Sequence, residues 1–357
     1  MTIQTHAPFL SIIIPVHNQT TLLKKLIRSI LDEPMPLGSI EILVTDDGSA
    51  SPVVPDQLLD ADRISRSAAP SVGVYDADRA TSCLRIVRHD SSRGAAAARN
   101  TAADAAAGEI LLFLDADTIL ETGSLLRVHD RFQAEPALGA INGGGSMDPA
   151  NPEDGFTARY RALLDHIQQN RRAPSTCSFF TPRLGAVRKK FFVACGRFDP
   201  AFPGASVEEY EFGHRLTRLC PIGFDPEVNV RHHYQRFWKN CRNHFNRVRL
   251  WMPLFWKRKK FENFGSVTRS YGFGSGFGFL AAAIAPFVCL SVPAAAGFVA
   301  CFFLFLAGFA ELFLWTIRLK GYVFLVQSVL LSWWLCLFIV TGAVAGTVDT
   351  FLGRTPD

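Results

Sequence analysis

The stretch "ILLFLDADTIL", residues 110–120, is an apolar run that ends abruptly at two aspartates, Asp115 and Asp117. A short apolar run of this kind is typical of a strand that is buried on both faces of a sheet. In extended backbone, residues two apart point to the same side, so both carboxylates can face one object. Close carboxylates repel each other unless a proton or a cation intervenes. The stretch therefore predicts a rigid strand that ends in a cation site.

Three further apolar runs predict strands that precede this one in the chain. They are "FLSIIIPV" (9–16), "IEILV" (40–44) and "LRIV" (84–87). Apolar residues recur at helical spacing between residues 22 and 31, and the alanine-rich segment 95–107 also predicts a helix. We expect Asn18 to cap the first of these helices. The alternation of strands and helices predicts an α/β fold with a mostly parallel sheet, whose ligands bind at the carboxyl ends of the strands.

Acidic residues stand at two of these predicted strand ends. Asp115 and Asp117 suit a hard divalent ion, Mg²⁺ or Mn²⁺, that would neutralise a diphosphate leaving group. Asp47 lies in "TDDGS", where it can either accept from a nucleotide base or ribose, or form an Asx turn that introduces Gly48. The spacing of two aspartates around one residue also arises by chance, and an aspartate at a strand end often caps the next helix.

Five motifs occur together and in a fixed order. They are "SIIIPVHN" (11–18), "VTDDGS" (44–49), "SSRGAAAARNTAADAAAGEILLFLDADT" (91–118), "VACGRFDPAF" (193–202) and "VEEYEFGHRL" (207–216). In this order they resemble a family-2 glycosyltransferase with the GT-A fold. The resemblance covers roughly residues 9–218 and implies a nucleotide-sugar-binding domain. It also implies that a sugar is transferred from a nucleotide-diphosphate donor with inversion at the anomeric carbon.

The resemblance implies roles for seven residues of the nucleotide-sugar and metal sites. Pro15 and Asn18 would line the nucleotide site, Asp47 would bind the base, Arg99 would help to hold the donor, Asp115 would touch ribose or metal, Asp117 would be the firmest metal ligand, and His232 would be a further metal ligand. Arg99 can alternatively be an arginine on the surface of an alanine-rich helix. The pair of histidines at 232 and 233 can equally be structural.

The motif "VEEYEFGHRL" is similar to the acidic motif of the family, commonly Glu-Asp-x-Asp. Glu209 stands where the catalytic aspartate usually lies, which implies that it is the general base that deprotonates the acceptor hydroxyl. Glu208 and Glu211 are the alternatives within the same motif. Acidic residues also stabilise a helix N-terminus, so the cluster can be purely structural.

The last third of the chain is strongly apolar. Glu311 is the only charged residue between Phe277 and Thr316, and residues 321–348 carry no charge. Because a spanning helix needs about 20 apolar residues, the sequence predicts three transmembrane spans, near 275–292, 295–317 and 321–347. Residues 1–238 would form the cytosolic domain, 239–272 a basic amphipathic juxtamembrane segment, and 273–350 the membrane domain. Glu311 is either functional or close to the membrane interface.

The charge distribution indicates a membrane partner rather than a nucleic acid. The formal net charge is +5, and residues 239–270 hold nine Lys and Arg residues against one acid, Glu262. A basic, aromatic segment beside a span is typical of one held against anionic headgroups, although a solvated linker is the alternative. The N-terminus lacks a secretory signal pattern. The sequence thus predicts a multi-pass protein of the bacterial inner membrane with a cytoplasmic catalytic domain.

The sequence-based hypothesis is a membrane-anchored glycosyltransferase that acts on a lipid-linked glycan or glycolipid in polysaccharide or glycoconjugate synthesis. Its partners would be a nucleotide-diphosphate sugar, that acceptor and membrane lipids. One alternative is a non-catalytic component of a polysaccharide assembly complex that binds nucleotide sugars. Another is a nucleotidyltransferase, which would release pyrophosphate instead of a nucleoside diphosphate.

Overall fold

The structure is a computed structural model that describes residues 8–34, 40–59, 83–170, 176–202, 207–262 and 265–354. The chain divides into two compact units. The sheet unit comprises Met1–Ser146 and Ala173–His233, and the helical unit comprises Met147–Arg172 and Tyr234–Asp357.

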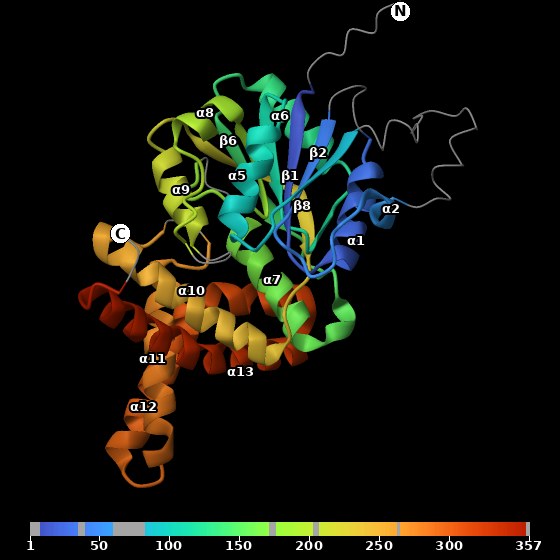
Figure 1. Ribbon diagram of the computed structural model, residues 1–357. Coiled ribbons are helices and arrows are strands. Elements are labelled where there is room, and N and C mark those ends of the chain that lie inside the picture. The colour runs from blue at the N-terminus through green and yellow to red at the C-terminus, as the bar shows by residue number, and fades with distance from the viewer. Residues whose placement is uncertain are drawn as a thin grey trace, which may run out of the picture. The chain divides into compact units, whose positions relative to one another are not determined.

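The sheet unit is built on one mixed sheet of eight strands (Figure 1). They are β1 (Leu10–Val16), β2 (Ile40–Asp46), β3 (Leu84–Arg88), β4 (Ile110–Leu114), β5 (Thr118–Leu120), β6 (Ala140–Gly145), β7 (Leu184–Arg188) and β8 (Ile222–His232), in the order β3-β2-β1-β4-β7-β6-β8-β5. The strands β1 to β4 are parallel, as the alternation of strands and helices predicts. β7 is antiparallel to both of its neighbours, β6 and β8 are parallel, and β5 is antiparallel to β8.

Apolar side chains cover both faces of the central strands, which explains why these strands have continuous apolar sequences. On one face, residues such as Ile12 and Leu112 pack with the buried side of α1. On the other face, Phe113 contacts Phe180 and Phe198, with ring centroids 5.8 and 5.3 Å apart. The helices among the described residues of this unit are α1 (Thr20–Leu31), α2 (Pro55–Leu58), α5 (Ala95–Ala105), α6 (Ser124–Ala134), α8 (Lys189–Ala194) and α9 (Glu208–Leu216).

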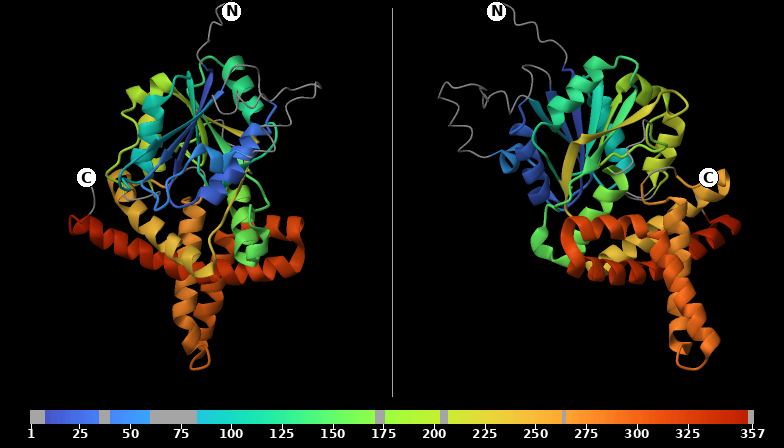
Figure 2. Two further views of the ribbon diagram at one scale, coloured as in Figure 1. Left: turned by 45° about the vertical axis from the view of Figure 1, so that its right-hand side comes forward. Right: turned by 180° about the vertical axis from the view of Figure 1, so that it is seen from behind.

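The helical unit contains α7 (Phe156–Asn170), preceded by a short 3-10 turn at Pro152–Asp154, and four C-terminal helices. They are α10 (Phe237–Arg258), α11 (Arg269–Ile284), α12 (Val292–Gly308) and α13 (Ala310–Phe351), with a further 3-10 turn at Ala285–Phe287. Helices α11 and α12 form a hairpin that projects away from α10 and α13 (Figure 2).

The prediction of three transmembrane spans is wrong. Within the described residues, α13 is the one helix that is long and apolar enough to cross a membrane. The first predicted span falls on α11, which has 16 residues, and the second is interrupted at Phe309, between the 17-residue helix α12 and α13. Helices of this length reach only about 24–26 Å, against a hydrocarbon core of about 30 Å. Helix α13 is itself kinked at Gly321, where φ is 82° and ψ is −177°.

Candidate active site

A cluster of three possible metal ligands forms where β4, β5 and β8 meet. Asp115 and Asp117 lie in the turn between β4 and β5, and the antiparallel pairing of β5 with β8 places His232 opposite Thr118. One ligand atom from each of Asp115, Asp117 and His232 lies within 4.8 Å of the others. The Nε2 atom of His232 is 3.3 Å from Oδ1 of Asp117, and the backbone N–H of His233 donates to the Asp117 carbonyl at 2.8 Å.

The electrostatics of this cluster favour a bound cation. Burial opposes ionisation of Asp117, but His232, a backbone hydrogen bond and the nearby His233 together outweigh it and lower the pKa of the carboxyl group below its ordinary range. Two carboxylates and one imidazole then offer two oxygen ligands and one nitrogen ligand. Such an oxygen-rich set suits Mn²⁺ or Mg²⁺ and leaves coordination positions for phosphate oxygens. Asp115, Asp117 and His232 therefore fit a divalent metal site.

Arg99 links this cluster to the acidic motif on α9. Its side chain is 1% exposed and lies on α5, so it is not an arginine on the helix surface. It donates to Oδ1 of Asp115 and to Oε1 of Glu208, both at 2.8 Å. Burial disfavours the guanidinium charge, but the two carboxylates outweigh it and raise the pKa of Arg99. Arg99 is thus positioned as an internal counter-ion that orients both acids.

The three acids at the start of α9 have different environments. Glu208 is buried and bound to Arg99. Glu211 accepts from Arg215 with both oxygens, at 2.5 and 2.7 Å. Glu209 is half-buried, and its backbone carbonyl accepts from the N–H of Phe180. Ion pairs therefore engage the carboxylates of Glu208 and Glu211.

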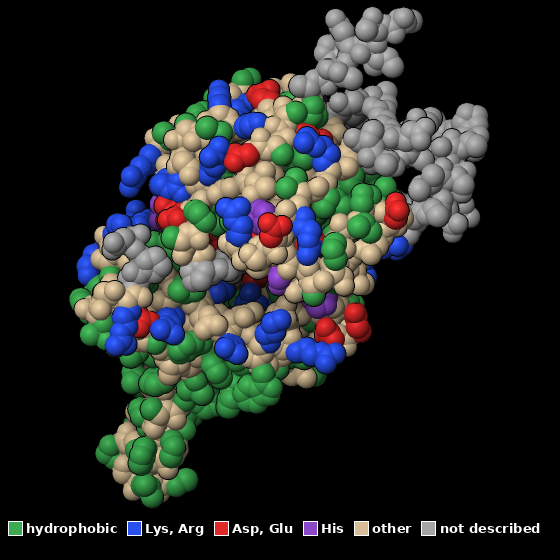
Figure 3. All heavy atoms as spheres, viewed as in Figure 1, with side chains coloured by type: hydrophobic (Ala, Val, Ile, Leu, Met, Phe, Trp, Pro, Cys, Tyr) green, Lys and Arg blue, Asp and Glu red, His purple; other side chains and the backbone are tan. Residues whose placement is uncertain are grey.

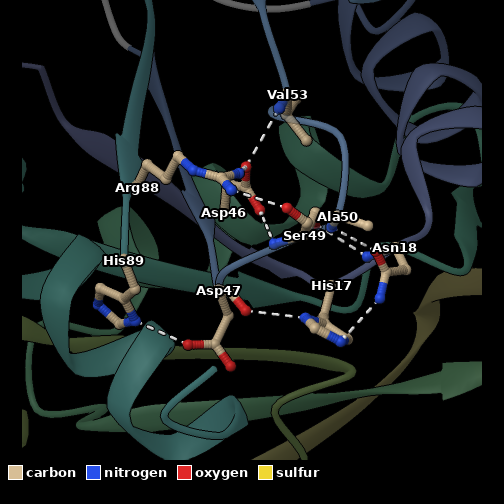
Figure 4. A network of polar contacts seen from close by, with 9 residues as sticks. All are labelled: His17, Asn18, Asp46, Asp47, Ser49, Ala50, Val53, Arg88 and His89. Carbon is tan, nitrogen blue, oxygen red and sulfur yellow. Dashed lines mark hydrogen bonds and ion pairs between the residues drawn. The ribbon is translucent and has the colours of Figure 1, made fainter. Parts of the chain in front are cut away.

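The "TDDGS" turn after β2 is crosslinked to its surroundings by its two aspartates (Figure 4). Asp46 is fully buried and accepts from the N–H groups of Ser49 and Val53 and from Arg88. Asp47 accepts from His89 at 2.7 Å and from Ser92, Arg93 and Gly94 at 2.8–2.9 Å. Four hydrogen bonds fill the acceptor capacity of a carboxylate. In this conformation the Asp47 carboxylate therefore fixes the loop that leads into α5.

Asn18 binds the same turn instead of capping α1. The N-cap of α1 is Gln19, so the predicted capping role of Asn18 is wrong. Asn18 has a positive φ of 56°, its N–H donates to Ser49 Oγ, and its Oδ1 accepts from the N–H of Ala50. Its Nδ2 contacts His17, whose Nδ1 lies 2.8 Å from the Asp47 carbonyl. The ends of β1 and β2 are therefore tied together, with Pro15 paired to Thr45 just before them.

Sequence reasoning did not single out His17, His89 or the role of Glu208. His89 lies between Asp47 and the hydroxyl of Thr101, with contacts of 2.7 and 2.9 Å, and so joins the end of β3 to α5. The available signal was positional, because His17 and His89 each stand within two residues of the end of a predicted strand, much as Asp115 and Asp47 stand within one and three residues of theirs. No spacing rule could reveal that Arg99 pairs with Glu208, which lies 109 residues away.

Together, the mixed α/β sheet and the acidic cluster at its strand ends define a protein of the nucleotide-sugar-binding class with a GT-A fold. The sequence profile described as glycosyl transferase family 2 matches residues 11–195, more than half of the chain. The chain belongs to glycosyl transferase family 2, as the five motifs predict.

Comparison with a solved structure supports the same fold. The mannosyltransferase PcManGT from Pyrobaculum calidifontis, in complex with GDP-Man and Mn²⁺, superposes with a TM-score of 0.53 at 17% identity. The match covers 98% of this chain and 89% of that protein. At this identity the likeness concerns the fold alone.

Two curated relatives are similar over parts of their length. Glycosyltransferase AglE of Haloferax volcanii is 33% identical over 110 residues, which is 31% of each chain. The pre-mycofactocin glycosyltransferase of Mycobacterium tuberculosis is 28% identical over 234 residues, or 63% of this chain and 43% of that protein. The chain therefore spans less than half the length of these relatives.

Proposed function

We propose that the chain is a metal-dependent, inverting glycosyltransferase that moves a sugar from a nucleotide-diphosphate donor to a lipid-linked glycan or glycolipid. The observation that carries this proposal is the grouping of Asp115, Asp117 and His232 within 4.8 Å at the strand ends. The proposal is supported further by Arg99, which joins Asp115 to the motif that holds Glu209.

Each part of the site has a role in this chemistry. Asp115, Asp117 and His232 would hold the divalent cation, which, when bound, supplies the positive charge that stabilises a departing diphosphate. Arg99 orients Asp115 and fixes the start of α9 through Glu208. Glu209 accepts the proton of the acceptor hydroxyl as its oxygen attacks the anomeric carbon. Pro15, Asn18 and the Asp47 turn would line the nucleotide side of the site.

The C-terminal helices support a lipid-linked acceptor and membrane anchoring. Only 28% of the most apolar 18-residue window of α13 is buried. The core helix of a soluble domain would be mostly buried, so this surface needs another apolar environment. An enzyme held at a bilayer meets acceptors whose sugar or phosphate head protrudes from a lipid. We place the sheet unit on the cytoplasmic side, in polysaccharide or glycoconjugate synthesis.

The decisive experiment measures the products formed from a panel of sugar nucleotides by purified full-length protein, with and without Mn²⁺. We expect Mn²⁺-dependent release of a nucleoside diphosphate, which Asp117→Ala abolishes. Asp130→Asn is the matched control, because this side chain is 61% exposed, on α6. Release of pyrophosphate would indicate a nucleotidyltransferase instead. If no donor on the panel were turned over, the protein would be a binding component.

The acceptor class is tested separately with membranes that contain the protein. Radiolabelled donor sugar should pass into the organic phase on extraction, because the product is a lipid. Label that stays wholly in the aqueous phase would contradict a lipid acceptor but would leave the glycosyltransferase assignment intact.

A further inference from the structure

Helix α13 exposes an apolar stripe after its kink at Gly321, interrupted by the exposed Thr341. The stripe consists of Val323, Val326, Leu330, Trp334, Val344, Val348 and Phe351, which are between 42% and 76% exposed. These positions are separated by three or four residues, or by ten (two steps of three and one of four), so they share one face of the helix. The opposite face is buried and includes Ser328, Leu335, Gly342 and Gly346. Over about 30 residues, α13 therefore has one exposed apolar face and one buried face.

The buried face of α13 is locked against α10. A methyl group on Gly342 would lie 2.5 Å from the Phe245 carbonyl oxygen, and one on Gly346 would lie 2.1 Å from that of Arg249. The two backbones thus touch where only glycine fits. Arg249 also donates to Asp349 at 2.5 Å.

The contact between α10 and α13 extends along both helices. Trp238 packs against Trp334 near one end, with ring centroids 6.5 Å apart. Trp256 packs against Phe351 at the other end, with centroids 5.3 Å apart, and its indole N–H donates to Thr347. The two helices therefore run side by side from Trp334 to Phe351, and they must lie at the same depth in any membrane.

Because α10 is strongly basic, the paired stretches of α10 and α13 do not lie in the hydrocarbon core of a membrane. Helix α10 carries six Lys and Arg residues and no acid, and Arg242 and Arg247 are exposed. The paired stretch of α13 is about 27 Å long, close to the thickness of the hydrocarbon core. A membrane-spanning α13 would therefore draw these cations into lipid, at about 2.5–3.5 kcal/mol or more for each one near the centre.

In contrast to the basic α10, the hairpin of α11 and α12 is apolar and nearly uncharged. No charged residue lies between Arg269 and Glu311. Phe287, Leu290, Val292 and Phe303 are 54–82% exposed, and Figure 3 shows hydrophobic side chains over the projecting hairpin. The hairpin runs crosswise to α13 in both views of Figure 2. If the hairpin enters the bilayer, α13 lies along the membrane surface.

We infer that α10 and α13 form an in-plane platform on an anionic bilayer, with the hairpin inserted and with α13 not crossing the membrane. The apolar stripe of α13 faces the acyl chains, and the cations of α10 bind anionic headgroups. Both ends of the hairpin and the C-terminus then lie on the same side as the sheet unit. The inference rests on the proposed membrane association and is independent of glycosyl transfer.

Topology reporters at the C-terminus of the full chain test this arrangement in bacterial cells. Green fluorescent protein matures in the cytoplasm, and alkaline phosphatase is active only outside it, so each location gives a positive signal. We expect fluorescence without phosphatase activity, matching a fluorescent protein fused at the N-terminus. Phosphatase activity at the C-terminus alone would overturn the inference, because a crossing α13 places the two ends on opposite sides.

The depth of α13 can be measured independently with single spin labels at Val326→Cys, Leu337→Cys and Val348→Cys. Cys83, Cys289 and Cys301 would be serine in this background, since the other five cysteines are buried. An in-plane helix gives equal accessibility to oxygen at the three positions, whereas a spanning helix makes position 337 much deeper than the others. A protein that stays in the soluble fraction would overturn both the inference and membrane association, and would leave a second copy of the chain as the occupant of the stripe.

Discussion

Asp115 and Glu208 are held by one guanidinium, that of Arg99, which is 2.8 Å from each carboxylate. The arginine lies on α5, Asp115 follows β4, and Glu208 begins α9. Three separate chain segments therefore meet at the buried guanidinium of Arg99. In the proposed mechanism Arg99 is therefore a positioning residue, which orients Asp115 and, through Glu208, the start of α9 where Glu209 lies.

Replacing Arg99 should destabilise the protein strongly. Arg99→Met leaves two carboxylates without their cation, and breaking a buried ion pair by removing one partner costs about 3–5 kcal/mol. Arg99→Lys keeps the charge but cannot bridge both acids, so we expect an intermediate loss. The measurement is the free energy of unfolding by denaturant. Arg85→Lys is the control, because Arg85 is 56% exposed and a surface pair contributes about 0–1 kcal/mol.

The free energy of unfolding of Arg99→Met without metal shows whether Arg99 stabilises the fold through its ion pairs or acts only through the cation site. If the variant unfolds like the wild type without metal and loses only Mn²⁺ binding, Arg99 would act through the cation site alone. The ion-pair account would then be contradicted.

The three acids of α9 should respond differently to neutralisation. Glu209→Gln should lower kcat about 10²–10⁴-fold, the usual contribution of a general base, while donor binding stays unchanged. Glu211→Gln is the matched control, because its ion pair with Arg215 would be lost without removal of the base. Steady-state kinetics with the best donor gives both kcat and KM. An equal loss of kcat in Glu211→Gln would show that the base has been assigned to the wrong residue.

The sequence was sufficient to predict four of the eight strands and to single out the acidic turn after β4, because both depend on local pattern. The apolar runs at 9–16, 40–44, 84–87 and 110–114 are strands, with bounds shifted by one or two residues. The pairing of β5 with β8, which brings His232 to Asp117, depends on chain segments about 110 residues apart, so no local pattern could reveal it.

The span prediction failed for a related reason. Hydropathy averages over the break at Phe309, where the backbone leaves the helix although the sequence stays apolar, and over the end of α11 at Ile284. The Asn18 prediction failed because its side chain found acceptors and donors in the Asp47 turn, a tertiary contact that competes with local capping.

His232 should contribute to metal affinity, in contrast to its neighbour. His232→Gln removes the nitrogen ligand near Asp117, so we expect Mn²⁺ to bind about tenfold more weakly, equivalent to about 1.4 kcal/mol. The rise in unfolding temperature with added Mn²⁺ reports this affinity. His233→Gln is the matched control on the adjacent residue. A normal Mn²⁺ response in His232→Gln would remove this residue from the ligand set.

His244 should make the helical unit sensitive to acid. Its Nδ1 lies 2.9 Å from the Asn240 carbonyl and its Nε2 lies 3.2 Å from Nη1 of Arg161, so a neutral ring satisfies both contacts. Burial, assisted by the charge of Arg161, lowers the pKa of His244 from 6.5 to about 3. Between these two values the unfolded chain binds a proton that the folded protein does not. Stability is therefore intact above pH 6.5 and falls with acidification, by up to about 1.4 kcal/mol per pH unit.

The test compares the free energy of unfolding of the wild type and of His244→Gln between pH 7.5 and 4.5. Glutamine can accept from Arg161 but does not titrate, so the variant should lose less stability than the wild type as the pH falls. His129→Gln serves as the control, because this histidine is on α6, where it contacts the exposed Asp130 and the ring of Phe9. Parallel pH profiles for the wild type and His244→Gln would mean that His244 is already protonated in the folded protein, with its ring turned away from Arg161.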